Sequence, residues 1–549
     1  MQNTVAPQVM SLPGVPEALA WLRAQGGQGV RGLCLDSRQV QAGDAFVAWP
    51  GWATDGRRFV PSALQAGAVA ALVDEEGLAP WLPEWHAATH THGKVASLRN
   101  LKACTGELAS AFFDHPSRFM DVVAVTGTNG KTSTAWWLAQ ALGVLGRPCG
   151  MVGTLGMGLP PLPGVQSPEV ALDGVNALAG FTPTGLTTPD PVTWQKQLRE
   201  WANGGVQACV VEASSIGLQE HRLDGTRVAV AVFTNFTQDH LDYHGSMQAY
   251  WAAKARLFRW HGLGAAVVNV DDAHGAQLAE QLAQPFASQP PDWPLWTVSL
   301  SAPPSRATSS RGRQLYANGL RATATGMAMT VVEHRGGQTR QADLQVPFVG
   351  RYNASNLLGV VAAMRALGID LPDAVQACAA VGAVPGRMES VTDGQAGRPL
   401  VLVDYAHTPD AVAQALAALR PLAQVRGGRL YCVVGCGGDR DAAKRPLMAS
   451  AAEAGSDGLC LTSDNPRSED PLHILHQMQA GLSEPQAVAI QPDRALAIAQ
   501  TVAQAQPADV VLIAGKGHEA TQDIKGQKFP FSDAQQVLLA FHSIGEGRV

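Results

Sequence analysis

The sequence predicts an α/β fold of several domains built on parallel sheets, and three observations lead to this prediction. The chain has 549 residues, more than one hydrophobic core usually serves, so we expect about three domains. Hydrophobic residues make up 46% of the chain and charged residues 16%, which is typical of globular proteins and not of disordered ones. Short apolar runs that end at Gly or a polar turn alternate with Ala- and Leu-rich segments along the whole sequence.

The apolar runs are typical of buried parallel strands, and the Ala- and Leu-rich segments between them are typical of helices. Ligands of such sheets bind at the carboxyl ends of the strands, so functional residues should directly follow these runs. The runs are VVAVTG from Val122, ACVVEA from Ala208, AVVNV from Ala266, LVLVDY from Leu400, LYCVVG from Leu430 and VVLIAG from Val510.

Two short segments indicate domain boundaries. A polar segment around Asp114 to Met120 precedes the strongest strand, and a Pro/Gly segment around Val381 to Glu389 precedes another series of strands. The stretches Gly156 to Pro183 and Gln284 to Arg313 are rich in Pro, Gly and Ser and predict surface insertions. The predicted domains are residues 1–118, 119–384 and 385–549.

Charge and composition exclude several classes of protein. The formal net charge of −6 provides no general field for nucleic acid, so we expect no nucleic-acid partner. Met1 to Pro16 lacks the features of a signal peptide, and no run reaches the roughly 18 apolar residues of a membrane span. We therefore predict a cytoplasmic protein without membrane insertion. The eight cysteines do not form the paired motifs of a zinc site.

The segment TGTNGKTS, between a predicted strand and a predicted helix, indicates a phosphate-binding loop. Its glycines let backbone N–H groups close on phosphate oxygens, and the helix N-terminus adds positive partial charge. The usual pattern has Gly five residues before Gly130, where this chain has Val125. Nucleotide binding alone leaves kinase, ATPase and ligase chemistry open. The predicted ATP-binding residues here are Gly127, Thr128, Asn129, Gly130, Lys131, Thr132 and Ser133.

Polar groups follow two neighbouring strands and can face the phosphates. Glu212 ends the run ACVVEA, and Asp239 and His240 follow the next predicted strand. The hydroxyl of Thr132 would ligate Mg²⁺, and a carboxylate and an imidazole at this edge can hold a second Mg²⁺. Lys131 would neutralise the β- and γ-phosphates of ATP. A helical lysine such as Lys254 is, taken by itself, typical of a solvated surface.

These motifs resemble two related families. TGTNGKT resembles the ATP loop of the Mur ligases and of the folylpolyglutamate synthetases, and TNxxxDHLDxH followed by YxxAK resembles the Mur ligases. The resemblance implies that CO₂ carbamylates Lys254 and that the new carboxylate ligates a second Mg²⁺. This chemistry needs a neutral amine, which a desolvated lysine can supply. The implied catalytic residues are Lys131, Glu212, His240 and Lys254, and the implied metal ligands are Thr132, Glu212, His240 and carbamylated Lys254.

The same resemblance extends to the domain junction and to the nucleotide substrate. Asn353 and Asn356 in RYNASN, Arg387 in GRME, and Asp404 with His407 in DYAHTP match positions that hold ATP in this family. The segment LDSRQVQAGDAFVAWPGWATDGRRF resembles a UDP-binding domain of the family, in which Trp52 can stack on uracil. The usual SSHGL reads SSIGL here, with Ile216 in place of His. The resemblance implies that the UDP substrate has two sets of binding residues. Those around the uridine are Leu35, Ser37, Trp52, Ala53 and Thr54. Those that hold the muramoyl dipeptide are Thr187, Thr188, Ser214 and Arg222, and Glu220 also belongs to the substrate site.

The C-terminal third carries GCGGDRDAAKRP, TSDNPRSED and AGKGHE. DNPR resembles the signature of the Mur ligases that take meso-diaminopimelate, and lysine-adding relatives lack its arginine. Diaminopimelate differs from lysine by a second carboxylate, which Arg440 and Arg467 would clamp, while Asp464 and Glu519 would receive the distal ammonium. The implied diaminopimelate-binding residues are Arg440, Asp464, Asn465, Pro466, Arg467, Gly515 and Glu519.

The resemblance as a whole implies three α/β domains. These are a smaller N-terminal UDP-binding domain, a central P-loop ATPase domain with a parallel sheet, and a Rossmann-like C-terminal domain. It implies a monomeric, ATP- and Mg²⁺-dependent acid–amino-acid ligase of peptidoglycan synthesis that acts on UDP-N-acetylmuramoyl-L-alanyl-D-glutamate and meso-2,6-diaminopimelate. Three alternatives stay open: a lysine-adding Mur ligase, a folylpolyglutamate synthetase, and a non-catalytic nucleotide-binding protein. The intact Lys131, Glu212, His240 and Lys254 argue against the last.

Overall fold

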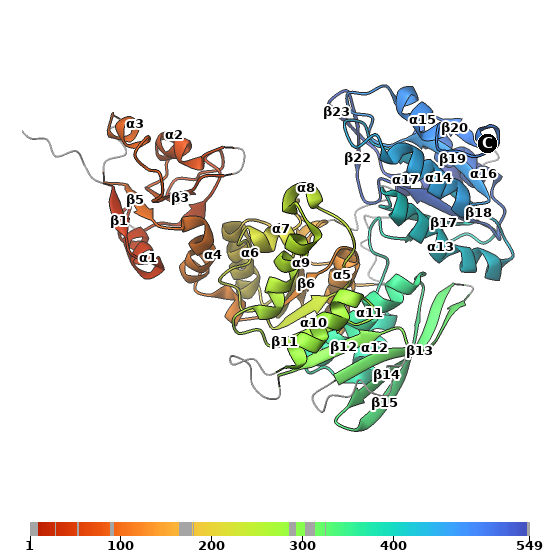
Figure 1. The fold of residues 1–549 in the computed structure, drawn as a ribbon, viewed down its shortest axis with the longest axis horizontal. Coiled ribbons are helices and arrows are strands. Elements are labelled where there is room, and N and C mark those ends of the chain that lie inside the picture. The colour runs from red at the N-terminus through yellow and green to blue at the C-terminus, as the bar shows by residue number, and fades with distance from the viewer. Residues whose placement is uncertain are drawn as a thin grey trace, which may run out of the picture.

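Three sheets follow one another along the chain, and helices cover them (Figure 1). The computed structural model describes residues 9–27, 29–51, 54–87, 93–163, 178, 180–284, 293–301, 313–323 and 325–545. The sheets are wholly or mainly parallel, which confirms the predicted α/β class. Each sheet lies within one of the three predicted domain ranges, and the boundaries at residues 118 and 384 stay predictions.

The N-terminal sheet has five strands, all parallel, in the order β1-β5-β4-β3-β2. Apolar side chains on α1 and α4 pack onto one face of it, and those on α2 pack onto the other. The strands are β1 (Met10–Leu12), β2 (Gly32–Cys34), β3 (Asp44–Ala48), β4 (Ala70–Asp74) and β5 (Val95–Leu98). The helices are α1 (Val15–Ala24), α2 (Val60–Gln65), α3 (Leu82–Ala87) and α4 (Leu101–Phe112).

The central sheet has ten strands in the order β15-β14-β13-β12-β11-β10-β6-β9-β7-β8, with antiparallel pairs only at its two edges. Strands β9, β10 and β11 are buried at every position, as expected for parallel strands covered on both faces. Because β10, β6 and β9 are neighbours, their carboxyl ends meet at one edge. The strands are β6 (Asp121–Thr126), β7 (Cys149–Gly153), β8 (Gly156–Gly158), β9 (Ala208–Glu212), β10 (Val230–Phe233), β11 (Ala265–Asn269), β12 (Leu295–Ser299), β13 (Arg313–Thr323), β14 (Gly326–Arg335) and β15 (Gln338–Val346).

Helices on both faces complete the central part. Helix α5 is buried over most of its circumference, with Trp136 and Trp137 inside the core, and it packs against α11. Helix α6 begins at Pro191 because the side chain of Asp190 accepts hydrogen bonds from Val192 N and Thr193 N. The helices are α5 (Lys131–Val144), α6 (Pro191–Asn203), α7 (Ser215–Gln219), α8 (Leu241–His244), α9 (Met247–Ala255), α10 (Ala273–Ala283), α11 (Arg351–Ala366) and α12 (Leu371–Ala379).

The C-terminal sheet has six strands in the order β16-β17-β21-β18-β19-β20, and only the pair β16–β17 is antiparallel. A small hairpin, β22 (Thr521–Ile524) with β23 (Gln527–Pro530), follows β21. The strands are β16 (Glu389–Val391), β17 (Leu400–Asp404), β18 (Leu430–Cys436), β19 (Gly458–Ser463), β20 (Ala489–Gln491) and β21 (Val510–Ala514). The helices are α13 (Pro409–Arg426), α14 (Lys444–Gly455), α15 (Pro471–Gln479), α16 (Arg494–Gln504) and α17 (Asp533–Gly545).

Specific contacts join the three parts. Helix α4 packs closely on the central part because Gly106 has no Cβ, and an added Cβ there would overlap the backbone of Asp224. Lys102 on α4 also forms an ion pair with Glu220 at 2.6 Å. At the other junction Val349 and Tyr352, at the start of α11, pack into the core of the C-terminal part. The C-terminal part is thereby held next to the carboxyl edge of the central sheet (Figure 1).

One expectation was partly wrong. The stretch Gln284 to Arg313, expected to be a surface insertion, contains strand β12, which pairs with β11 and β13. The alternating buried Trp296 and Val298 explain this, because they place a half-apolar strand inside a Pro- and Ser-rich segment. Residues 164–177, 285–292 and 302–312 of the two stretches lie outside the described residues.

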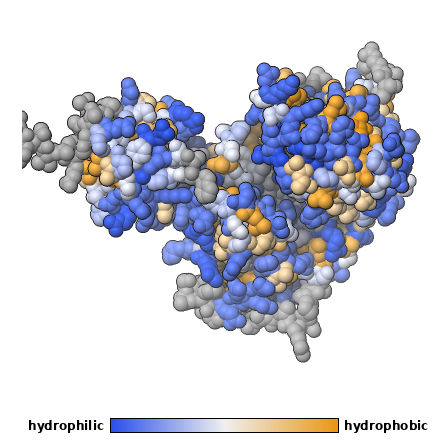
Figure 2. Space-filling view, turned by 45° about the horizontal axis from the view of Figure 1, so that its top comes forward, coloured by the Kyte–Doolittle hydropathy of each residue, from blue (hydrophilic) through white to orange (hydrophobic). Residues whose placement is uncertain are grey.

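Of the helices in the described part of the chain, none is long and apolar enough to cross a membrane. On the face seen in Figure 2, hydrophilic residues predominate and hydrophobic ones form small groups.

Candidate active site

The predicted phosphate loop connects β6 to α5 at the carboxyl edge of the central sheet. Gly127 and Gly130 have φ values of 147° and 80°, which favour glycine. The residues after β10 fix the loop: Thr128 N donates to Asn235 O at 2.8 Å, and Thr234 Oγ1 donates to Asn129 O at 2.6 Å. The helix α5 begins at Lys131, so its free N–H groups face the loop, as the sequence predicted.

Two lysines converge on one carbonyl of this loop. Lys131 Nζ donates to Gly127 O at 3.0 Å and to Thr128 O at 2.7 Å, and Lys254 Nζ donates to Gly127 O at 2.7 Å. Lys254 is only 1% exposed, and its ammonium lies 4.5 Å from the centre of the Tyr250 ring. Burial and the charge of Lys131 lower the pKa of Lys254 to about 6, against the opposing effect of Asp239. Lys254 is therefore largely uncharged at neutral pH.

The carboxylate of Glu212 lies at the end of β9, beside the loop. Its side chain is 0% exposed and accepts hydrogen bonds from Thr154 N at 2.9 Å and Thr154 Oγ1 at 3.2 Å. Burial lowers the pKa of Lys131, and the negative charges of Glu212 and Asp239 oppose this shift. Lys131, Glu212 and Asp239 therefore share one electrostatic environment, as their positions after adjacent strands predicted.

His240 lies at the open side of this group. Its backbone has φ 50°, and its Nε2 lies 3.5 Å from Asp239 Oδ2, with 44% of its side chain exposed. The rings of His240 and Tyr250 are 6.0 Å apart. The imidazole is thus free to turn toward a ligand at the loop.

The residue types fit Mg²⁺. Thr132, Glu212 and a carbamylated Lys254 would offer hard oxygen ligands, which Mg²⁺ prefers, and His240 adds one nitrogen. Among the described residues no three His, Cys, Asp or Glu side chains converge on one point.

The residues predicted to hold the muramoyl dipeptide lie next to Glu212. Thr188 is 0% exposed, and its Oγ1 donates to Glu212 O at 2.6 Å and lies 2.9 Å from Ser214 Oγ. Arg222 Nη1 donates to Thr188 O at 2.9 Å. Thr187 Oγ1 lies 3.4 Å from Thr154 Oγ1, so Thr154 touches both Thr187 and Glu212.

Glu220 has partners from two other segments. Besides the ion pair with Lys102, it accepts a hydrogen bond from Tyr243 OH at 2.6 Å. These partners hold its pKa below the usual range, against the effect of burial. Glu220 thus lies at the junction of α4 with the central part.

The predicted uridine residues belong to the N-terminal part of the sequence, and the strands and helices of that part lie apart from β6 and α5 in Figure 1. Leu35 packs against the N-terminal core and Ser37 follows it in a half-buried turn. Thr54 is exposed, and its carbonyl accepts a hydrogen bond from Gly51 N at 3.0 Å. Trp52 and Ala53 lie outside the described residues.

The predicted cross-domain ATP residues line the junction of the central and C-terminal parts. Arg387 stacks over the Tyr405 ring at 4.8 Å, and its positive charge contributes to the lowered pKa of Lys131. Its Nε is buried, and no acceptor for it lies among the described residues. Asp404 Oδ1 accepts from Met388 N at 2.8 Å, and burial raises the pKa of this carboxyl.

The remaining members of this set are Asn353, Asn356 and His407. Asn353 Nδ2 donates to Val349 O at 2.8 Å, and an added Cβ on Gly130 would touch the Asn356 amide. His407 is exposed, with its Nδ1 2.9 Å from Tyr405 O. The structure thus brings Asn356 and Arg387 toward the phosphate loop, while His407 lies on the C-terminal side of the junction.

The predicted amino-acid residues come together at the carboxyl ends of β18, β19 and β21. Asn465 Nδ2 donates to Glu519 Oε2 at 2.7 Å, and an added Cβ on Gly515 would lie 2.6 Å from Asp464 Oδ2. Arg467 Nη1 donates to Gly438 O at 2.6 Å, in the loop that carries Arg440, which is exposed. Pro466 is buried between them. DNPR and AGKGHE, 51 residues apart at Asn465 and Lys516, are therefore one site.

Lys516 belongs to this cluster, although the sequence analysis did not single it out. It is 0% exposed, and its Nζ donates to Asn465 Oδ1 at 3.0 Å, Glu519 Oε2 at 3.1 Å and Thr521 O at 2.8 Å. The lysine stands inside AGKGHE, so its motif was visible, but no residue spacing revealed that it is buried. Tyr250, which contacts both Thr128 and Lys254, was missed for the same reason.

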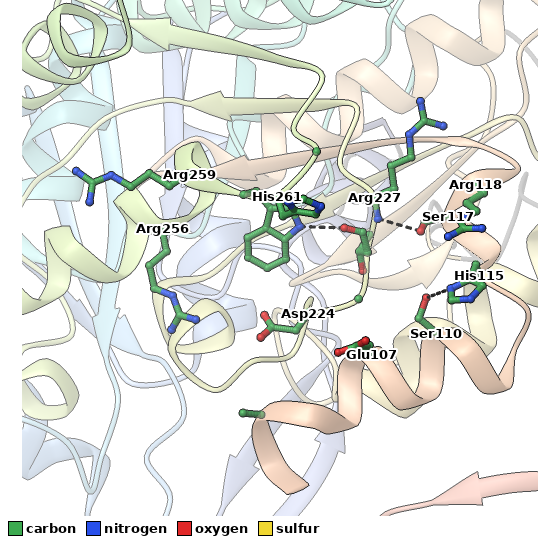
Figure 3. Close-up of a pocket in the computed structure, with 15 residues that line it drawn as sticks. Glu107, Ser110, His115, Ser117, Arg118, Asp224, Arg227, Arg256, Arg259 and His261 are labelled. Carbon is green, nitrogen blue, oxygen red and sulfur yellow. Dashed lines mark hydrogen bonds between the residues drawn. The ribbon is translucent and has the colours of Figure 1, made fainter. Parts of the chain in front are cut away.

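A cavity of about 870 Å³ lies elsewhere, between α4 and the loops that precede β6, β10 and β11 (Figure 3). This is the amino edge of the central sheet, opposite the phosphate loop. Figure 3 shows Arg227, Arg256 and Arg259 pointing in different directions, so their charges do not converge on one ligand position. The cavity is not part of the candidate active site.

Comparison with known families agrees with this geometry. Three family models match: "Mur ligase family, catalytic domain" over residues 29–112, "Mur ligase middle domain" over 125–364, and "Mur ligase, glutamate ligase domain" over 386–517. Together they span most of the chain, and each covers most of one of the three large sheets.

Curated relatives match over nearly their whole length. The chain is 52% identical over 538 residues to the UDP-N-acetylmuramoyl-L-alanyl-D-glutamate--2,6-diaminopimelate ligase of Acidovorax sp. (strain JS42), covering 96% of this chain and 97% of the relative. It is 43% identical to the protein of that name from Janthinobacterium sp. (strain Marseille), covering 97% and 98%.

Solved structures show the same fold. A structure of UDP-N-acetylmuramoyl-L-alanyl-D-glutamate--2,6-diaminopimelate ligase matches with a TM-score of 0.65 and 33% identity, covering 94% of this chain and 96% of that one. A folylpolyglutamate synthase from Mycobacterium tuberculosis matches in fold alone, with a TM-score of 0.51 and 20% identity, over 74% of this chain and 91% of that one. The three family models, the identities and the fold agree, and the chain belongs to the Mur ligase family.

Proposed function

We propose that this protein uses ATP to join meso-2,6-diaminopimelate to the D-glutamate carboxylate of UDP-N-acetylmuramoyl-L-alanyl-D-glutamate, in peptidoglycan synthesis. The observation that carries the proposal is the cluster of Asp464, Asn465, Arg467 and Glu519, which offers cationic and anionic groups side by side. The relatives named for this reaction support it, with identities of 52% and 43% over the whole chain. We also propose that the protein acts in the cytoplasm as a monomer.

The phosphate end of the reaction belongs to the central part. The N–H groups of Gly127, Thr128, Asn129, Gly130, Lys131, Thr132 and Ser133 would surround the phosphates, and Lys131 would move from the loop carbonyls onto the β- and γ-oxygens. Arg387 has a buried Nε in need of an acceptor, which a phosphate oxygen would satisfy. Asn353, Asp404 and His407 would complete the ATP site from the other side of the junction.

The reaction proceeds in two steps. An oxygen of the D-glutamate carboxylate attacks the γ-phosphorus of ATP, so an acyl phosphate forms and ADP leaves. The neutral amine of diaminopimelate then attacks the acyl carbon, the amide bond forms, and inorganic phosphate leaves as the nitrogen gives up a proton. Lys131 stabilises charge on the transferring phosphoryl group, and no covalent enzyme intermediate is needed.

Mg²⁺, held by Thr132, Glu212, His240 and carbamylated Lys254, would supply charge neutralisation at the phosphates when bound. The carbamate forms when the neutral amine of Lys254 attacks CO₂ and loses a proton, which converts a buried amine into an anion. The position of Lys254 beside Lys131 and the loop supports this modification, because a nearby cation stabilises the new anion.

The nucleotide substrate and diaminopimelate would approach the phosphate loop from different parts of the protein. Leu35, Ser37, Trp52, Ala53 and Thr54 would receive the uridine part, and Thr187, Thr188, Ser214, Glu220 and Arg222 the peptide part near Glu212. Arg440 and Arg467 would pair with the second carboxylate of diaminopimelate, and Asp464 and Glu519 with its distal ammonium. The absence of a Cβ at Gly515 allows the Asp464 carboxylate to lie against it, and Asn465 with Pro466 would shape the turn.

The proposal is tested by incubating the protein with ATP, Mg²⁺ and UDP-N-acetylmuramoyl-L-alanyl-D-glutamate, with either meso-diaminopimelate or L-lysine. We expect phosphate release and a UDP-tripeptide mass with diaminopimelate, and at most traces with lysine. Equal use of lysine would contradict the substrate assignment. Absence of product with both amino acids would contradict the proposed reaction.

Carbamylation of Lys254 has its own measurement. Protein equilibrated with ¹³C-bicarbonate should give a carbamate carbon signal in NMR, and Lys254→Arg, which keeps a cation but cannot be modified in this way, should lack it. A signal that persists in Lys254→Arg would assign the carbamate to another amine. No signal in the wild-type protein would refute the modification.

A further inference from the structure

Two strands of the C-terminal sheet that are not neighbours are both followed by proposed substrate residues. Strand β18 lies between β19 and β21 and pairs with both. The register pairs Val434 with Ala514 and Cys436 with Ser463, so β18 ends level with the end of β19. Asp464 and Gly515 directly follow the ends of β19 and β21. The side chain of Asp464 therefore approaches Gly515 across the end of β18, and an added Cβ on Gly515 would lie 2.6 Å from Asp464 Oδ2.

One buried arginine connects the ends of these two strands. Arg494, the first residue of α16, donates from Nη1 to Ser463 O at 3.2 Å and from Nη2 to Ala514 O at 3.0 Å. These are the last carbonyls of β19 and β21. A single planar guanidinium thus holds the two strand ends at a fixed separation.

Asp533, at the start of α17, completes the arrangement. Its two oxygens accept from Arg494 Nε and Nη2 at 2.7 Å each, and both side chains are fully buried. Neither residue can touch a substrate. A buried ion pair is often no more stabilising than well-packed apolar residues, so stability alone does not account for this pair.

The pair also acts on Asp464 through space. Burial raises the pKa of Asp464, and among the charges that oppose this shift Arg494 has the largest effect, followed by Lys516. Glu519 and Asp533 act in the other direction, and Tyr405 and Cys436 are the further titratable neighbours. Arg494 therefore helps to keep Asp464 anionic.

We propose that Arg494 and Asp533 are a positioning pair for the amino-acid site. The pair fixes the positions of Asp464 and Gly515 relative to each other and so sets the affinity for the cationic end of the amino-acid substrate. This inference rests on the proposed function, which assigns Asp464 to the distal ammonium of diaminopimelate.

The test replaces the pair by apolar residues, Arg494→Met with Asp533→Leu, because apolar replacement of a buried ion pair usually preserves the fold. We expect the KM for meso-diaminopimelate to rise about tenfold or more. Loss of a residue that orients a binding residue without touching the ligand has effects of this size. The KM values for ATP and for the nucleotide substrate should stay nearly unchanged. The matched control is Arg365→Met with Glu333→Leu, a buried pair in the central part that should leave all three KM values unchanged.

A pH profile separates positioning from a general loss of structure. The double variant removes both Arg494, which lowers the pKa of Asp464, and Asp533, which raises it by a smaller amount. The pKa of Asp464 should therefore rise further, so that a larger fraction of this carboxyl is protonated at a given pH. In the double variant the KM for diaminopimelate should therefore fall as the pH is raised, and it should do so more steeply than in the wild-type protein. Arg494→Lys keeps the charge but loses the two-strand bridge, so it should raise the KM with little added pH dependence.

The outcomes are distinguishable. If the wild-type protein forms no product with diaminopimelate, the proposed function is wrong. If the wild-type protein is active and the folded double variant has an unchanged KM for diaminopimelate, or loses affinity for all three substrates equally, the positioning pair is refuted. Should the double variant not fold, Arg494→Lys decides in the same way.

Discussion

At the scale of single residues, the unusual feature is a pair of lysines on one loop carbonyl. Lys131 is expected at any phosphate loop, but Lys254 contacts Gly127 from a helix and stands 127 residues later in the chain. Its burial removes water from the ammonium and leaves the charge of Lys131 nearby. Both effects favour the neutral amine, which is the form that reacts with CO₂.

This arrangement predicts how stability depends on pH. The folded pKa of Lys254 is about 6, far below its ordinary value of 10.5, so between these values the unfolded chain binds one more proton than the folded chain. The free energy of unfolding should therefore rise with pH, by at most about 1.4 kcal/mol per pH unit from this residue. Urea unfolding in CO₂-free buffer between about pH 6.5 and about pH 8.5 should show the rise in wild type and a flatter profile in Lys254→Met. Parallel profiles would contradict the buried neutral lysine.

Much of the site at this scale was predictable, because its residues directly follow strands or stand in short motifs. Gly127 to Ser133 and Glu212 lie where two of the apolar runs end, and Asp464 to Arg467 form the motif DNPR. What could not be predicted was the partnership of residues that carry no motif. Arg494 and Asp533 stand in ordinary helix starts, and only tertiary structure reveals that they meet between two strand ends.

At the scale of elements, the connection from β6 to α5 depends on a close approach. An added Cβ on Gly127 would collide with Thr234 Oγ1 and lie 3.0 Å from Asn235 N, and φ there is 147°. The loop can only form its hydrogen bonds to the residues after β10 if this position has no side chain. The strands and the loop thus form one unit.

Gly127→Ala should therefore weaken ATP binding by more than about 100-fold, because the loop must move away from the geometry that directs its N–H groups at phosphates. Calorimetric titration with a non-hydrolysable ATP analogue measures this. The control is Gly146→Ala at the far end of α5, where φ is 74° and no atom lies within 4 Å of an added Cβ. That variant should lose about 1 kcal/mol of stability and bind the analogue normally. Equal affinities of both variants would contradict this account of the loop.

Elements were predicted well where apolar runs were continuous and poorly where composition was mixed. All six quoted runs are strands, because parallel strands covered on both faces need apolar residues at nearly every position. Strand β12 was missed because it is short, two of its five residues are only partly buried, and Pro and Ser flank it. The pairing of strands from distant parts of the chain was beyond any local pattern.

At the scale of the whole molecule, each of the three parts supplies one portion of the proposed site. The N-terminal part carries the proposed uridine residues, the central part the phosphate loop, and the C-terminal part the diaminopimelate cluster. Arg387 approaches the phosphate loop from the junction of the last two. Val349 and Tyr352 are the packed connection about which the C-terminal part would turn. Ligands that bridge both sides should favour the closed arrangement.

Small-angle scattering should accordingly show a smaller radius of gyration when the ATP analogue, Mg²⁺ and the nucleotide substrate are all present. Lys131→Met, which lacks the phosphate contact, should compact less under the same conditions. Unchanged dimensions of the wild-type protein on saturation with ligands would contradict closure.

The central claim, that the DNPR cluster selects diaminopimelate, is tested most directly by the ratio of kcat/KM for meso-diaminopimelate to that for L-lysine, in wild type, Arg467→Ala and Arg467→Lys. Loss of a charge-assisted hydrogen bond costs roughly 1.5–3 kcal/mol, so the ratio should fall by about 10- to 150-fold in Arg467→Ala, with a smaller fall in Arg467→Lys. The rate with lysine should change little. A ratio that is the same in all three proteins would contradict the assignment of this cluster to the second carboxylate.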